Sequence, residues 1–261
     1  MLNEPRIEKL RVYPIKSLDG VGLDCADVRS NGTLVRDREF ALFDDDGEIM
    51  NAKRDDRLHA ISAEFNPNSG ELTVDAPPAE SARFDLDRDL NAAETWFERV
   101  LGEEVTIRRD TEQGLSDRPG LGVSIVSTAT IRTVASWFDE LSVEGTRRRL
   151  RTNVEVSGVP AFWEDRLVGE DAPAFEVNGL RFEGAIPCGR CVVPERDPDT
   201  GEPLPEFRER FIRKRRNTFP DWADEGAFDH WFALTTITSL SGSTTNGTVR
   251  VGAPVELVED R

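Results

Sequence analysis

The sequence predicts a strand-rich α+β protein built in two sequential parts. Period-two apolar patterns dominate the first third of the chain, and similar patterns return in the second half. Between them lies a junction at 110–122, rich in Gly and Asp and containing Pro119. With 261 residues, of which 38% are hydrophobic, the chain can bury the core of one large or two small domains.

The charge balance excludes several classes of partner. Fifty acidic residues against 33 basic ones give a net charge of −17, which repels phosphate backbones, so we expect no nucleic-acid partner. Only four of the bases are lysines, and many acids with few lysines are typical of the acidic proteome of a halophilic cell. No stretch approaches the roughly 18 apolar residues of a membrane span. The N-terminus carries acids rather than a signal, so we expect a cytoplasmic protein without a membrane anchor.

Short strands are expected in the first third at 10–14, 40–43 and 72–74, where apolar residues recur at strand spacing. The acidic run 44–47 lies between strand patterns and predicts a solvated turn. It begins like a calcium-binding loop, but the alternating acids and closing Glu that such a loop needs do not follow.

Helices are expected at 91–101, where Gly102 supplies the stop, and at about 128–141, capped by Ser127 or Thr128. A basic helix is expected at 207–216. Eight side chains would face the core from the first two helices: Trp96, Phe97, Val100, Leu101, Ile131, Val134, Ala135 and Phe138.

Strand patterns in the second half surround two turns. Asn178-Gly179 lies within alternating apolar residues at 175–182, which predicts a hairpin with a type I′ turn. This hairpin leads directly into Pro187-Cys188-Gly-Arg190-Cys191. The segment 248–257 predicts a strand, a Gly-Ala-Pro turn and a closing strand.

The pair Cys188 and Cys191 admits several interpretations. Zinc would need four Cys or His ligands, and only Cys25, His59 and His230 remain, scattered along the chain. A redox pair should open a helix, which the Pro- and Asp-rich segment after Cys191 cannot do. Two interpretations stay open: two inert core cysteines, or one thiolate ligand for a soft or redox-active metal, kept ionised with help from Arg190.

Three polar segments are as compatible with a salt-bridged surface as with an anion site. Lys16-Ser17 follows a strand ended by Pro14, and 36–38 precedes an apolar strand. The segment 147–151 places four arginines within five residues of a strongly acidic chain. Guanidinium groups match phosphate oxygens, so a basic cluster in such a chain favours an anion site.

Taken together and in order, five segments resemble those of a known family. The chain is similar to the MOSC family, molybdenum cofactor sulfurase C-terminal-like proteins with an associated N-terminal β-barrel domain, and within it resembles the amidoxime-reducing molybdoenzymes. The resemblance covers about residues 6–258. The segments are Tyr13-Pro-Ile-Lys16-Ser17, Arg36-Asp-Arg38-Glu-Phe40, Arg151-Thr-Asn153 with Ser157-Gly158, Cys188-Gly-Arg-Cys191 with Asp197-Pro-Asp-Thr-Gly201, and Val251-Gly-Ala-Pro-Val255.

The resemblance implies an N-terminal β-barrel-like domain at 4–112, followed at 118–259 by a MOSC-type mixed β-barrel with a few helices. It also implies a molybdenum cofactor, a molybdopterin that holds the metal through its dithiolene. Cys191 would be the metal ligand and the catalytic residue. The implied cofactor-binding residues are Lys16, Ser17, Arg38, Arg151, Asn153 and, beside the thiolate, Arg190.

The function implied is that of a molybdenum-dependent oxidoreductase that reduces small N-hydroxylated substrates. We expect a monomer served by a separate electron-donor protein, since no cysteines that could hold a fused ferredoxin cluster follow Cys191. The alternative is a cofactor carrier or sulfur-transfer protein, with a persulfide on Cys191 and no turnover of its own. Thr152 stands where family members often have Pro, so the local turn is expected to differ.

Overall fold

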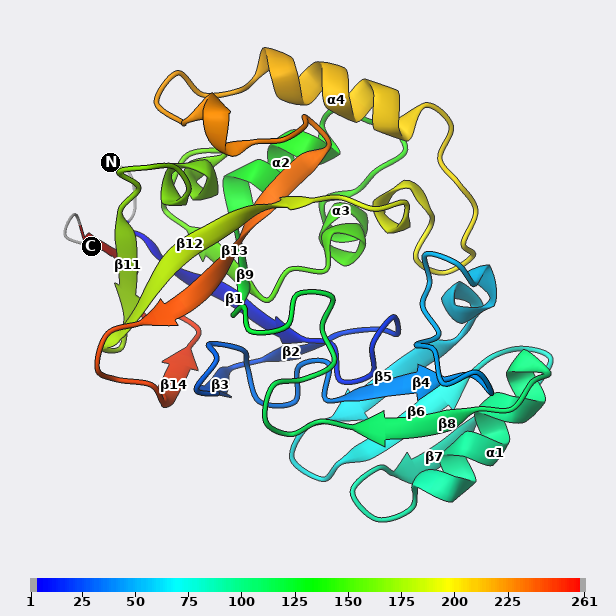
Figure 1. The fold of residues 1–261 in the computed structure, drawn as a ribbon. Helices are drawn as coiled ribbons and strands as arrows, with labels where there is room; N and C mark the ends of the chain where they lie inside the picture. Colours follow the sequence, from blue (N-terminus) through cyan, green and yellow to red (C-terminus); the bar gives the residue numbers. More distant parts are fainter. Residues whose placement is uncertain (1–3, 259–261) are drawn as a thin grey trace.

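The computed structural model describes residues 4–258 and centres on one large mixed sheet (Figure 1). Its eight strands are β1 (Arg6–Val12), β2 (Val21–Leu23), β9 (Ser124–Ser127), β10 (Val154–Ser157), β11 (Ala174–Val177), β12 (Leu180–Gly189), β13 (Ala233–Ser241) and β15 (Glu256–Val258). They pair in the order β15-β11-β12-β13-β9-β10-β1-β2, and the segment before β15 bridges to the start of β1, where Arg6 lies opposite Pro254. Only β9 and β10 run parallel; the other neighbours are antiparallel.

Three smaller sheets complete the strand content. They consist of β3 (Cys25–Val28) with β14 (Gly247–Arg250), β4 (Phe40–Phe43) with β8 (Thr106–Arg109), and β5 (Ser62–Asn66), β6 (Glu71–Asp75) and β7 (Ala82–Asp85) side by side. The strands expected in the first third are therefore present, although β1 ends at Val12. The hairpin turn is also confirmed, because Asn178 and Gly179 both have the positive φ that a type I′ turn requires, 51° and 78°.

Four α-helices and four short 3₁₀ segments connect the strands. The helices are α1 (Leu90–Leu101), α2 (Thr128–Ala135), α3 (Val143–Leu150) and α4 (Phe207–Asn217), and the 3₁₀ segments are η1 (Asp56–Ala60), η2 (Trp163–Leu167), η3 (Val193–Glu195) and η4 (Glu225–Ala227). Helix α1 ends on Gly102 in the left-handed conformation, as its sequence predicts. Helix α4 matches its predicted range to within one residue.

Helix α2 is shorter than predicted. Ser127 caps its N-terminus as expected, but the helix ends at Ala135 rather than near 141. Tight turns follow, in which Trp137 and Phe138 donate to the carbonyls three residues earlier. Both aromatic side chains still reach the core, where Trp137 packs on Phe211 and Phe138 stacks on Phe207. Aromatic packing therefore overrides the helical pattern beyond Ala135.

Three apolar clusters form the core. One fills the space around the large sheet, one lies between α1 and the strands β4 to β8, and one joins α2 and α4 to the sheet. Figure 1 shows α1 and α4 at opposite ends of the molecule. No helix within residues 4–258 is long and apolar enough to cross a membrane.

The N-terminal strands are shared between the two halves of the chain. Strand β1 pairs with β10, and β3 pairs with β14. Hydrogen bonding therefore does not follow the predicted domain boundary between 112 and 118, which stays a prediction. The predicted end of the second domain at residue 259 lies outside the described residues. This strand sharing brings the loop after β1 to the end of β12, where the candidate site lies.

Candidate functional site

One cavity of about 370 Å³ brings together the seven residues predicted to bind the cofactor or its metal. Its wall comes from the loop after β1, the segment before β4, the end of α3 and the end of β12. Parts of the chain that are far apart in sequence thus meet at one place. The predicted residues that line it are Lys16, Ser17, Arg38, Arg151, Asn153, Arg190 and Cys191.

The two cysteines of the pair lie in the cavity wall and not in the core. Cys188 is the penultimate residue of strand β12, and Cys191 follows in the loop after the strand. Both are half-buried free thiols that line the cavity, which excludes the interpretation as inert core residues. The Arg190 guanidinium lies 3.3 Å from the Cys188 sulfur and donates to the Leu150 carbonyl. Arg190 therefore contacts the first cysteine, whereas the sequence placed it in support of the second.

Three of the predicted residues have an unusual backbone. Ser17, Arg38 and Arg151 adopt positive φ values of 75°, 46° and 53°. Residues with a Cβ rarely occupy this region, and such conformations cluster at binding and catalytic sites because the surrounding structure must hold them there. Arg151 adopts it because it caps the C-terminus of α3, which turns its side chain away from the helix.

Tyr13 separates two guanidinium groups. Its ring centre lies 4.8 Å from the Arg38 guanidinium carbon and 4.2 Å from that of Arg151. Arg38 also pairs with Asp37 at 2.5 Å. Burial raises the pKa of Tyr13, although the nearby arginines oppose the shift. Tyr13 therefore stays a neutral ring on which both cations stack.

Among the residues described, Arg151 has no counter-anion, unlike Lys16 and Arg38, which each pair with an aspartate. No carboxylate within residues 4–258 forms an ion pair with its guanidinium. Burial lowers the pKa of Arg151 to about 10, and the charge of Arg38 adds to this effect. A guanidinium remains protonated even so, because pH 7 is well below that value. The cavity wall thus contains a half-buried positive charge that forms no ion pair with any carboxylate of residues 4–258.

Lys16 shares a carboxylate with Lys53 at another part of the wall. Lys16 Nζ lies 2.7 Å from Asp117 Oδ1, and Lys53 pairs with the other oxygen of Asp117. Burial by itself would raise the pKa of Asp117, but hydrogen bonds from both lysines outweigh it and the pKa falls to about 2. The neighbouring Ser17 hydroxyl accepts from the Ala52 N–H at 3.2 Å.

Asn153 uses its amide to hold the wall together. Its Oδ1 accepts from the backbone N–H and the hydroxyl of Ser124, and its Nδ2 donates to the Arg11 carbonyl. The side chain is 4% exposed. Asn153 therefore positions β1, β9 and the segment after α3 relative to one another.

The arginine cluster at 147–151 divides into two groups. Arg147, Arg148 and Arg149 lie on α3, a helix that the sequence does not predict. Each pairs with an acid: Arg147 with Glu155 at 2.6 Å, Arg148 with Asp199 at 2.6 Å, and Arg149 with Asp197 at 3.2 Å. The salt-bridged interpretation holds for these three, and the anion-site interpretation remains for Arg151 alone.

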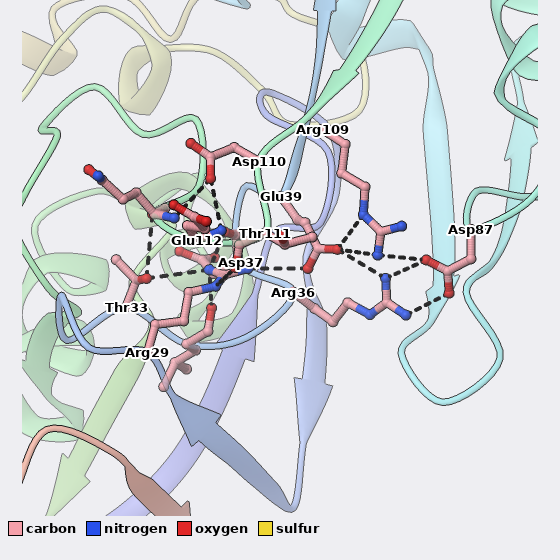
Figure 2. A network of polar contacts seen from close by, with 12 residues as sticks. Arg29, Thr33, Arg36, Asp37, Glu39, Asp87, Arg109, Asp110, Thr111 and Glu112 are labelled. Carbon is pink, nitrogen blue, oxygen red and sulfur yellow. Dashed lines mark hydrogen bonds and ion pairs between the residues drawn. The ribbon is translucent and has the colours of Figure 1, made fainter.

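Arg36 also proves to be structural, although only one residue separates it from Arg38. Figure 2 shows its guanidinium between Glu39 and Asp87. Arg29 and Arg109 reach the same Glu39 carboxylate, at 3.1 and 2.7 Å. This Glu39 network lies beside the cavity and does not contribute to its wall.

Comparison with known proteins identifies the family. The family model described as the MOSC N-terminal beta barrel domain matches residues 4–141, and the model described as the MOSC domain matches residues 116–256. The chain belongs to the MOSC family. Its resemblance to that family, inferred from five short segments, is thereby confirmed.

Named relatives of this MOSC protein come from two groups. Mitochondrial amidoxime reducing component 2 from Macaca fascicularis is 27% identical over 75% of this chain and 68% of its own length. Molybdenum cofactor sulfurase from Solanum lycopersicum is 23% identical over 75% of this chain but only 29% of its own length. A crystal structure of the YuaD protein from Bacillus subtilis matches 99% of this chain and 98% of its own with a TM-score of 0.45 and 14% identity.

The donor set of this MOSC cavity fits the cofactor associated with the family. No group of three or more His, Cys, Asp or Glu within residues 4–258 is arranged to hold a metal. A metal at Cys191 would therefore need most of its ligands from another molecule, as it would have from a dithiolene. Thiolate suits a soft metal, and the unpaired Arg151 with Lys16 and Arg38 suits an anionic group.

Several wall residues were not anticipated from the sequence. Lys53, Asp117 and Arg118 line the cavity, and Tyr13 organises two of its arginines. Lys53 is one of only four lysines in the chain, and this rarity could have indicated that it belongs to the site. Asp117 and Arg118 lie in the 110–122 junction, where composition indicates only a connecting segment.

Proposed function

We propose that this protein binds a molybdenum cofactor in the cavity and reduces N-hydroxylated compounds there. One observation carries the proposal: Cys191 shares a cavity with Arg151, a half-buried cation for which the described residues provide no ion-pair partner. A buried charge without a partner is costly, and an anionic ligand would relieve that cost. The relatedness to amidoxime reducing components supports the same assignment.

Each residue would have a distinct task. The Cys191 thiolate would be the protein's ligand to the metal. Arg38 and Arg151, which both stack on Tyr13, would bind and orient the anionic part of the cofactor, together with Lys16 and the Ser17 hydroxyl. Asn153 would keep the wall in place. The cofactor itself would supply the two-electron chemistry.

The overall reaction would consume two electrons and two protons. The N–O bond of R–NHOH breaks, the nitrogen is reduced to the amine R–NH₂, and the oxygen leaves as water. A separate electron-donor protein would supply the electrons. The small cavity supports a small substrate.

The test is turnover with a chemical reductant, which bypasses the protein donor. Protein expressed in a host that makes the cofactor should convert an aromatic amidoxime to the amidine when supplied with reduced methyl viologen. The same protein from a host unable to make the cofactor should not. Equal rates from the two preparations would contradict the proposal.

A carrier or sulfur-transfer role makes a different prediction for the same experiment. The molybdenum cofactor sulfurase relative motivates this alternative. Such a protein would contain the cofactor, or a persulfide on Cys191, and yet form no amidine. Mass spectrometry of the intact chain would detect the persulfide as one added sulfur atom.

A further inference from the structure

Helix α4 forms a positive surface on a strongly negative protein. Its eleven residues include six bases and one acid, Glu209, in a chain of net charge −17. The acids of the following segment, Asp221, Asp224, Glu225 and Asp229, lie after the helix and keep the positive charge confined to α4.

Two of the six bases are used inside the protein. Arg215 is fully buried and pairs with Asp165 at 2.6 Å, and Arg210 lies 3.9 Å from Glu140. The other four form the α4 basic patch: Arg208, Arg213, Lys214 and Arg216. All four are exposed, and none of them forms an ion pair with another residue of the described range 4–258. On α3 and around Glu39, by contrast, the arginines are paired, so α4 differs in having four exposed, unpaired bases on one helix.

The patch connects to the candidate site through a short chain of contacts. The Arg208 guanidinium carbon lies 4.8 Å from the ring centre of Phe232. The Phe232 carbonyl accepts a hydrogen bond of 2.8 Å from the Arg190 N–H. Arg190 is bonded directly to Cys191. Arg208 is therefore linked to the proposed metal ligand through Phe232 and Arg190.

We propose that the α4 basic patch is the docking surface for a strongly acidic electron-transfer protein. The inference rests on the proposed function, which requires a separate electron donor. Complementary charges at the contact would orient the donor over Phe232, while the −17 charge of the whole chain would repel misplaced encounters. A nucleic acid is disfavoured, because the patch extends along a single helix only about 16 Å long and the chain as a whole repels phosphates.

Each turnover requires two molecules of a one-electron donor protein, because the reduction consumes two electrons. Each reduced one-electron carrier gives up one electron and leaves oxidised. Two such transfers, with two protons from solvent, convert R–NHOH to R–NH₂ and water. Docking at α4 would place the point of entry beside Phe232 and Arg190.

The experiment compares two charge-reversal variants of equal net charge. In Arg213→Glu/Lys214→Glu, two patch bases become acids. In the control Arg99→Glu/Arg250→Glu, the same change is made at exposed bases on α1 and β14, which lie away from α4 (Figure 1). An acidic [2Fe–2S] ferredoxin is the probe. Its dissociation constant and its rate of electron delivery are measured at 0.15 M KCl, where the Debye length of about 8 Å screens remote charges.

The patch variant should bind ferredoxin about tenfold more weakly and deliver electrons about tenfold more slowly than the wild type, and the control should stay close to the wild type. Both should keep wild-type rates with reduced methyl viologen. Equal losses in the two variants, or no ferredoxin binding by the wild type, would overturn the docking proposal. So would preferential binding of a single-stranded RNA to α4. Absence of methyl viologen activity in the wild type would instead overturn the proposed function, and the binding measurements would still decide the docking site.

Discussion

Two neighbouring groups of arginines differ in whether their charges are paired with carboxylates. In the Glu39 network, Arg29, Arg36 and Arg109 all reach one carboxylate that is 2% exposed, and Asp87 pairs with two of them (Figure 2). In the cavity, Arg151 stacks on Tyr13 and has no ion-pair partner among the described residues.

The difference separates structural charge from charge available to a ligand. In a desolvated ion pair within the chain, the two opposite charges compensate each other, so no ligand is required. A guanidinium cannot lose its proton at neutral pH, so an unpaired one needs an anion from outside. Residue type and burial are similar in the two clusters. The partner, or its absence, is what distinguishes them.

The largest effect is expected from Glu39→Ala. It leaves three arginines around an empty position, and breaking a buried ion pair by removing one partner costs about 3–5 kcal/mol. The free energy of unfolding, measured by urea denaturation, should fall by that amount. Arg83→Ala is the control, since its pair with Glu71 is long at 3.6 Å and its side chain is 67% exposed. A loss as small as that of the control would show that the network does not stabilise the fold.

A smaller effect of a different kind is expected from Arg151→Met. Removing an unpaired cation should leave the free energy of unfolding unchanged or raise it. Cofactor retention after gel filtration should fall about tenfold or more, because a hydrogen bond to a charged group contributes about 1.5–3 kcal/mol.

Arg149→Met is the matched variant for that experiment. Arg149 lies two residues before Arg151 and is buried, but it pairs with Asp197 and donates to the Arg196 carbonyl. This variant should lose stability instead of showing a specific loss of cofactor. If both variants behaved alike, the distinction between paired and unpaired arginines would have no functional meaning.

The sequence predicts which residues line the cavity better than it predicts which of their charges are paired. The five family segments bring the right residues together, and strand and helix patterns locate β4, β6, α1 and α4. Helix α3 escapes prediction because its sequence, VEGTRRRL, is mostly polar and includes Gly145. Whether an arginine is paired depends on side-chain direction. For Arg151 a left-handed cap residue sets that direction, which no residue pattern encodes.

A third buried charge sharpens the comparison, because a carboxyl group can neutralise itself. Glu164 is fully buried, and burial raises its pKa to about 8, with a contribution from Asp165. Its Oε2 accepts from the Ser127 N–H and the Thr130 hydroxyl, whereas its Oε1 has no hydrogen-bond partner in the described range. A proton replaces the counter-ion here.

The sign of the pH effect follows from the raised pKa. Folded protein keeps a proton that the unfolded chain releases above about pH 4.5, so the associated stability is complete below that pH and is lost as the pH rises through about 8. Glu164→Gln should therefore be more stable than the wild type at pH 9, by about 1 kcal/mol or more, and similar at pH 5. Thermal unfolding at the two pH values measures this. An identical pH dependence in both proteins would rule out a neutral Glu164.

The central claim is that Cys191 holds a molybdenum cofactor against the unpaired cation of the cavity. Elemental analysis of wild type, Cys191→Ser and Cys188→Ser, purified from a cofactor-producing host, tests it most directly. Circular dichroism of the three proteins would check that each is folded. The account predicts molybdenum in the wild type, most of it retained in Cys188→Ser, and none in Cys191→Ser. Equal molybdenum in the wild type and Cys191→Ser, or equal loss in both variants, would contradict the assignment of Cys191 as the ligand.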